Sequence, residues 1–158
     1  MAGARKVRDL TCDESFRSAA GKIIWTRFDE MMAMRDAVLK DKDIEDVHDM
    51  RVASRRLRAA VEGFSDAFPR KKLRPLLNEV KEIADTLGQV RDLDVMLARL
   101  AADRRGRLPA QRLVLSEMIA DMQRERIEAR KALAEHLDAI EESDFSRRFL
   151  TFIARETA

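Results

Sequence analysis

The chain has 158 residues, of which 46% are hydrophobic and 38% charged, and it contains only five glycines and three prolines. A chain of this length fits one domain with a real core, and this balance is typical of long amphipathic helices, not of a disordered tail. The formal net charge is only +2. We therefore expect one all-α domain over residues 1–158, with its core over about 12–156.

Cysteine content and hydropathy exclude several classes of protein. The single Cys12 excludes an internal disulfide and a multi-cysteine metal site, so the cytoplasm is the default compartment. No apolar run approaches the 18 residues that a membrane span needs, and the N-terminus lacks the apolar core of a signal peptide. Tyrosine is absent, and the one Trp and seven Phe mostly have helical core spacing, which disfavours binding to single-stranded nucleic acid.

The first two helices are predicted from apolar periodicity and capping residues. Apolar residues recur on one stripe over residues 12–39, which predicts a first helix that ends in the polar stretch 40–42. Asp43 is a good N-cap for a second helix, with Asp46 in its first turn. We expect this second helix to end near Phe68 and Pro69.

The remaining helices complete an antiparallel bundle. Pro75 fits the first turn of a third helix, which ends before residues 104–106. Pro109 opens a fourth helix that reaches about residue 141. Ser143 or Asp144 caps a short final helix containing Phe145, Phe149, Leu150 and Ile153. The expected fold is an antiparallel four-helix bundle with a short C-terminal helix.

The second predicted helix carries a row of cations along one edge of its apolar face. At about 100° per residue, four residues lie within roughly 80° of arc and rise about 15 Å along the axis: His48, Arg51, Arg55 and Arg58. We call these residues the basic ladder. No acid lies on this arc before Glu62, and arginine matches phosphate oxygens in a bidentate fashion. The pattern favours an extended polyanion as ligand, although a solvated helix face fits it about equally well.

Three more cations fall inside the apolar stripes of other helices, namely Arg27, Arg91 and Arg126. An unpaired guanidinium in a dry core would cost several kcal/mol, so each must meet a carboxylate, water or an anion. Asp94 can pair locally with Arg91, but no acid on the same arc accompanies Arg27 or Arg126. We therefore expect partly wet inner edges of the bundle, lined by these three residues together with Arg51 and Arg55.

The sequence offers little for catalysis or for a metal ion. Glu45 and His48 have the Glu-x-x-His spacing of di-iron bundles, but Leu133 precedes His136 at the corresponding position. His136 lies at the edge of an apolar stripe and is interpreted as a structural residue. The sequence contains no nucleophile with a nearby base and no glycine-rich phosphate loop. No acid and base are spaced in a way that indicates general acid–base catalysis. We therefore expect neither enzymatic activity nor a metal or cofactor.

Two stretches resemble the motifs of a known family. Residues 48–58 read HDMRVASRRLR, and residues 87–95 read LGQVRDLDV. With their order and separation, they resemble the CHAD family of histidine-bearing α-helical domains, which often lie beside CYTH triphosphatase domains. The resemblance is clear from the first helix to about Leu100 and weaker towards the C-terminus.

The resemblance implies a protein of two four-helix bundles with pseudo-twofold symmetry, which binds inorganic polyphosphate on a basic surface without catalysis. The residues assigned to polyphosphate in this way are His48, Arg51, Arg55, Arg56, Arg58, Lys71, Lys72 and Arg91. Arg27 and Arg126 join them as candidates because of their positions inside apolar stripes. No second His-x-x-Arg motif follows downstream, so we expect a short form with a single bundle.

The expected function is therefore non-catalytic binding of inorganic polyphosphate, in the cytoplasm and in association with polyphosphate granules. Two other interpretations use the same cations: an interaction bundle that recognises an acidic partner protein, and non-specific nucleic-acid binding. We also expect a homodimer, in which two chains enclose one polyanion or pair through Phe145, Phe149 and Phe152. The alternative is a monomer whose final helix covers the bundle and leaves the basic groove open.

Overall fold

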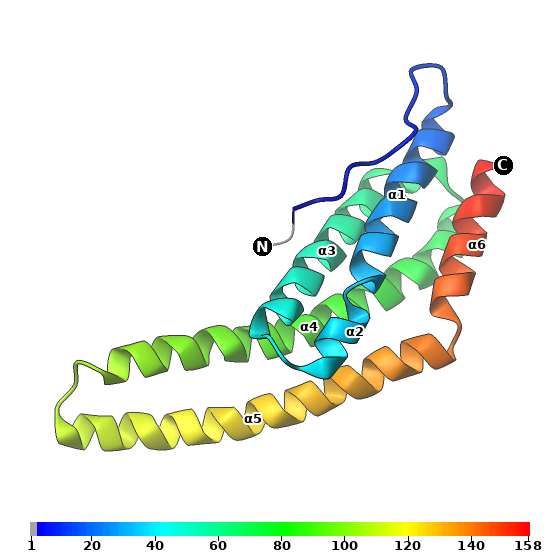
Figure 1. Cartoon of the computed structure of the whole chain (residues 1–158). Helices are drawn as coiled ribbons and strands as arrows, with labels where there is room; N and C mark the ends of the chain where they lie inside the picture. The colour runs from blue at the N-terminus through cyan, green and yellow to red at the C-terminus, as the bar shows by residue number, and fades with distance from the viewer. Residues whose placement is uncertain (1–2) are drawn as a thin grey trace.

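The computed structural model describes residues 3–158, and within that range it contains only helices and their connections (Figure 1). The elements are α1 (Phe16–Met32), α2 (Arg35–Lys40), α3 (Ile44–Gly63), the 3-10 turn η1 (Ser65–Ala67), α4 (Arg70–Arg104), α5 (Pro109–Glu142) and α6 (Phe145–Thr157). The all-α fold expected from the sequence is confirmed. None of the described helices combines the length and the hydropathy needed to cross a bilayer.

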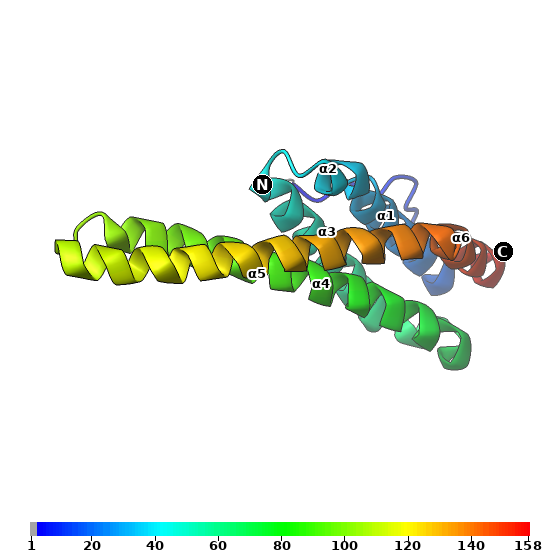
Figure 2. The same ribbon diagram turned by 90° about the horizontal axis from the view of Figure 1, so that it is seen from below.

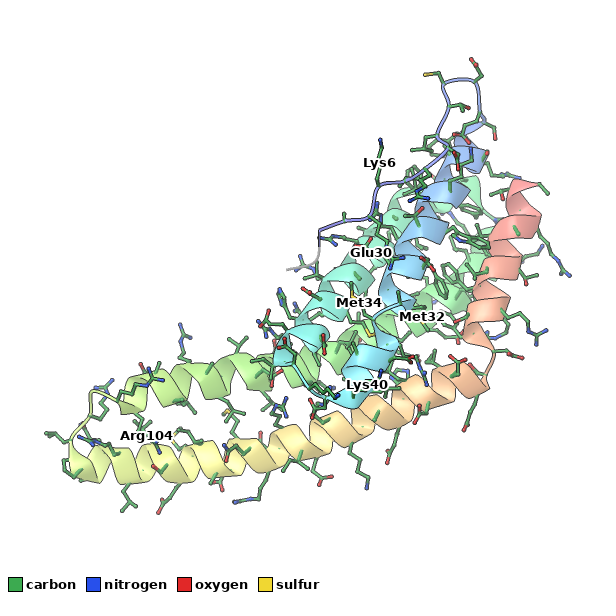
Figure 3. The ribbon with its side chains drawn as sticks, viewed as in Figure 1. Lys6, Glu30, Met32, Met34, Lys40 and Arg104 are labelled. Atoms are coloured by element: carbon green, nitrogen blue, oxygen red, sulfur yellow. The ribbon has the colours of Figure 1, made fainter. Side chains whose placement is uncertain are left out.

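The helices form a bundle with a long projection. α1 contacts α3 and α6, α3 contacts α4, and α4 and α5 run antiparallel to each other. Both α4 and α5 continue well past the other helices as a two-helix hairpin, which stands clear of the bundle in two perpendicular views (Figures 1 and 2). Arg104 lies at the tip of this hairpin (Figure 3).

Local caps determine where α1 and α3 begin. The Ser15 side chain accepts a hydrogen bond from the Ser18 amide at 3.1 Å, so α1 begins at Phe16 instead of near residue 12. The predicted cap of α3 is present, because Asp43 Oδ1 accepts from the Glu45 amide at 2.9 Å.

The single first helix predicted over residues 12–39 is wrong, because the chain breaks between α1 and α2. The Met34 amide donates a hydrogen bond to the Met31 carbonyl in a tight turn, and α2 then contacts α3 and is linked to α5 by side chains. Arg35 donates to Asp138 at 2.8 Å, and Arg130 donates to the carbonyl of Val38 at 2.6 Å. These tertiary contacts redirect a chain that contains neither Gly nor Pro at the break.

Two further boundaries differ from the prediction. α3 ends at Gly63, and the short turn η1 occupies the residues that we expected to complete the second helix. α4 begins at Arg70, directly after Pro69, so Pro75 lies in its second turn and not in its first. The bounds of α5 and α6 agree with the expected positions to within a few residues.

The contact between α1 and α6 is aromatic. Phe28 of α1 stacks on Phe149 of α6 with ring centroids 4.4 Å apart, and Phe145 packs against both rings. α1 and α6 approach closely at Gly21, where a side chain would collide with Thr157. Because Phe145 and Phe149 are fully buried within the chain, they are no surface for pairing two chains, and α6 covers the bundle instead.

Candidate functional site

The basic ladder lies on the edge of α3 that borders α4. Arg55 and Arg58 are exposed, whereas His48 and Arg51 are partly buried. Arg51 lies over Gly88 of α4, because a Cβ placed there would lie 3.8 Å from Arg51 Nε. The glycine of the second sequence motif thus makes room for an arginine of the first, and the two motifs meet in one surface.

The middle of the ladder has unneutralised charge. Across residues 3–158, no carboxylate pairs with the guanidinium of Arg51 or Arg55. The ring of His48 is less accessible to a ligand, since its Nδ1 is buried and has no hydrogen-bond partner in the described residues. Arg51 and Arg55 are therefore the centre of the positive surface.

The far end of the ladder is partly neutralised by Glu62. Arg58 Nε lies 3.1 Å from Glu62 Oε1, and Lys81 Nζ of α4 lies 3.3 Å from the same oxygen. Desolvation favours a higher pKa for Glu62, but the hydrogen bonds and charges of Arg58 and Lys81 outweigh it and lower the pKa. Glu62 is therefore a carboxylate at neutral pH, and it links the ladder to α4.

Two predicted site residues, Arg27 and Arg56, pair with the same acid. They hold the carboxylate of Glu30, which is only 1% exposed and lies between α1 and α3 (Figure 3). Arg56 Nη1 lies 2.7 Å from Glu30 Oε1, and Arg27 binds the other oxygen. The expectation that no acid accompanies Arg27 is wrong, because Glu30 follows one helical turn later.

Arg91 and Arg126 are also paired within the chain. Arg91 contacts Glu45 of α3 at 3.1 Å instead of the expected Asp94, and Asp94 binds Arg126 of α5 at 2.5 Å. The expectation that Arg126 lacks an acid is therefore wrong as well. Burial opposes the charge of Arg126, but Asp94 and Asp41 outweigh that effect and raise its pKa. These pairs join α3, α4 and α5 and do not extend the ladder.

The two lysines predicted at the start of α4, Lys71 and Lys72, have different surroundings. Lys72 turns to α6, where its Nζ lies 2.9 Å from Glu156 Oε1, and Lys71 is exposed. Sequence reasoning missed Lys81 and Arg74, which share one helix edge with Gly88 at seven-residue spacing. That spacing was visible in the sequence, and Lys81 reaches the ladder through Glu62.

The site is a shallow surface without a closed cavity. On the solvent side of α3, a hollow of about 530 Å³ is lined by Val52, Arg55, Arg56, Arg58, Ala59 and Glu62. No group of three or more His, Cys, Asp or Glu side chains in residues 3–158 is arranged to hold a metal ion. An open basic edge of this kind suits a long anion that lies along it more than a small molecule that needs enclosure.

The fold and the ladder define a helical domain with one basic edge, and the comparisons give its family. A model of the CHAD domain matches residues 22–158, so the chain belongs to the CHAD domain family, as its two motifs indicated. The crystal structure of the CHAD domain from the plant Ricinus communis is similar, with a TM-score of 0.70 and 27% sequence identity. The match covers 96% of this chain and 49% of that chain, so this chain spans about half of its length. No curated protein sequence matches the chain.

Proposed function

We propose that this domain binds inorganic polyphosphate, without catalysing a reaction, along the ladder edge of α3 and the adjoining edge of α4. The observation that carries the proposal is the pair Arg51 and Arg55, which have no carboxylate partner in the described chain. The chain has 29 acidic and 31 basic residues, and the other arginines predicted for the site on helices α1, α4 and α5 are paired. Membership of the CHAD family supports the same ligand.

The chemistry of the ladder suits a linear chain of phosphates. Arg51 and Arg55 are separated by about 6 Å along the helix axis, and Lys81 lies beyond Arg58 on the neighbouring helix. Each guanidinium can donate two parallel hydrogen bonds to phosphate oxygens. A bound polyanion also removes the mutual repulsion of neighbouring cations, which is a cost that the free protein carries.

The proposal is tested by titrating the protein with long-chain polyphosphate, duplex DNA and an acidic protein at two salt concentrations. We expect the double variant Arg51→Gln, Arg55→Gln to bind polyphosphate roughly 150-fold more weakly, at about 1.5 kcal/mol for each of the two charge-assisted contacts. The matched control is Arg124→Gln, Arg147→Gln, which removes the same charge from residues that already pair with Asp121 and Asp144. This control should bind as the wild type does.

Salt dependence separates the interpretations further. If three or four cations contact the polyanion, affinity should fall on the order of a hundredfold between 50 and 200 mM salt. Equal polyphosphate binding by the double variant and the wild type would contradict the assignment of the site. Tighter binding of DNA would favour nucleic acid as the ligand, and binding of the acidic protein alone would favour an interaction domain.

A further inference from the structure

The N-terminal segment, residues 3–15, lies along α1 and forms a hollow with it (Figure 1). Arg27 Nη2 of α1 donates to the carbonyl of Arg5 at 2.6 Å, and Lys22 Nζ donates to the carbonyl of Asp9. The segment therefore runs antiparallel to α1 over these contacts. It lies before the part of the chain that the family model matches. A site in this hollow does not involve the two motifs that identified the family.

The hollow contains an exposed aromatic ring. It has a volume of about 610 Å³, which is in the range of about 300–1,000 Å³ that small-molecule sites have. Trp25, the only tryptophan of the chain, lines it and is 44% exposed. Within residues 3–158, the indole ring contacts no other aromatic ring, and its N–H has no hydrogen-bond partner. A planar ligand therefore finds an open surface on which to stack.

The hollow also contains charges that the chain does not neutralise. Arg5 pairs with Asp29 there, and Lys22 pairs with Glu14 at 2.8 Å. The other three charged residues that line the hollow form no ion pair within residues 3–158: Lys6, Arg8 and Asp9. All three are exposed, and Figure 3 shows the Lys6 side chain extending outwards from the segment. The hollow thus offers one aromatic ring, two cations and one carboxylate to a ligand.

This combination matches the parts of a guanine nucleotide. A base stacks on an exposed aromatic side chain, and phosphate oxygens accept hydrogen bonds from lysine and arginine. The Watson–Crick edge of guanine presents two adjacent donors, N1–H and N2–H, to which a carboxylate offers two acceptor oxygens. Adenine instead places an acceptor, N1, beside its amino group, so it fits a carboxylate less well. Inorganic polyphosphate has neither a ring for the tryptophan nor a donor for the carboxylate.

We propose that the hollow between the N-terminal segment and α1 binds guanosine di- or triphosphate. Trp25 stacks on the base, Asp9 accepts hydrogen bonds from N1 and N2, and Lys6 and Arg8 contact the phosphates. The carboxylate selects the base, and the two cations select a nucleotide over a nucleoside. None of the ladder residues lines the hollow, so this binding is independent of the proposed polyphosphate binding.

The fluorescence of the full chain tests the proposal, because its single tryptophan lies in the proposed site. We expect GTP to quench this fluorescence saturably. ATP and guanosine should bind at least about tenfold more weakly, since ATP lacks the paired donors and guanosine lacks the phosphates. Inorganic tripolyphosphate should compete only weakly with GTP. The proposal is overturned by the absence of saturable quenching, by equal affinity for ATP and GTP, or by tripolyphosphate that competes as well as GTP binds.

Variants test the role of each residue, with binding followed by calorimetry so that the tryptophan itself can be replaced. Asp9→Asn should bind GTP about tenfold more weakly and bind ATP as the wild type does. The double variant Lys6→Gln, Arg8→Gln should weaken the binding of both nucleotides by about tenfold or more. Trp25→Ala should also weaken both by about tenfold, because it removes the stacking surface. An Asp9→Asn variant that keeps the full preference for GTP contradicts the proposal.

The matched control for the double variant is Lys40→Gln, Lys42→Gln. These lysines are exposed, form no ion pair within residues 3–158 and do not line the hollow. The control removes the same charge and should bind GTP as the wild type does, and circular dichroism checks that all variants stay helical. Equal weakening in the control and in Lys6→Gln, Arg8→Gln would show a general effect of net charge and would overturn the proposed site.

Discussion

The consecutive residues Arg55 and Arg56 of α3 have different surroundings, because successive side chains of a helix point about 100° apart. Arg55 faces solvent without a carboxylate partner in the described residues, whereas Arg56 turns to α1 and binds Glu30. Glu30 in turn is shared with Arg27, so one buried carboxylate holds two guanidiniums. The stretch that supplies the ladder therefore also joins α1 to α3.

Removing the buried carboxylate should be costly for stability. We expect Glu30→Ala to lower the free energy of unfolding by about 3 kcal/mol, because it leaves two partly buried guanidiniums uncompensated. Urea denaturation measures this difference. The control is Asp29→Ala on the same helix, whose pair with Arg5 is exposed and worth less than about 1 kcal/mol. Equal losses in the two variants would show that the Glu30 cluster contributes no more than a surface pair.

Residue partners could be predicted from sequence only where they are local. The ladder follows from spacing alone, and Glu30 lies one turn after Arg27, so that pair was accessible and was overlooked. The partner of Arg126 is Asp94, and the two residues meet only because α4 and α5 pack in one particular register. The same register leaves Glu45, and not Asp94, as the partner of Arg91.

At the scale of elements, the start of α1 depends on Glu14. This carboxylate forms an ion pair and hydrogen bond with Lys22 and accepts further hydrogen bonds from the Thr11 amide and the Ser18 hydroxyl. The bond from Lys22 is the largest of the effects that together lower the pKa of Glu14 from 4.5 to about 2. The ionised form of Glu14 thus fixes the chain before the Ser15 cap.

The pH dependence of this element follows from the lowered pKa. A carboxyl group with a lower pKa in the folded state contributes stability above pH 4.5, and this contribution disappears as the pH falls through about 2. We expect the protection factors for amide exchange in the first turn of α1, which are corrected for the intrinsic exchange rate at each pH, to fall over this interval. In Glu14→Gln, these protection factors should already be low at neutral pH and change little on acidification. An unchanged acid response in this variant would assign the effect to other carboxylates.

The helical elements were largely predictable, but the break between α1 and α2 was not. Met31, Met34 and Val38 continue one apolar stripe, and no Gly or Pro interrupts it. The break depends on α5, since Arg130 reaches the carbonyl of Val38 and also lies 3.2 Å from Asp41. Periodicity reports which residues face the core, but it does not report a change in direction caused by a helix almost a hundred residues away.

At the scale of the whole molecule, α6 closes the bundle through its aromatic residues. Phe149→Ala should cost about 3–5 kcal/mol, because the cavity left beside Phe28 lies in a packed core. For a chain of this size, that loss lowers the thermal midpoint by about 10 °C. Thr151→Ala, an exposed change on the same helix, is the control and should shift the midpoint little. A small effect of Phe149→Ala would mean that α6 is not required for the stability of the bundle.

The two longest helices cross a boundary between regions of different stability. Near Val90 and Leu137 the two helices are embedded in the core. Towards the tip, each of them packs only against the other. The free energy of local opening therefore declines along one continuous helix, although the ribbon shows no joint (Figure 2). The hairpin tip can fray and reform while the bundle remains folded, so a molecule that binds the tip orders a segment that the bundle leaves loose.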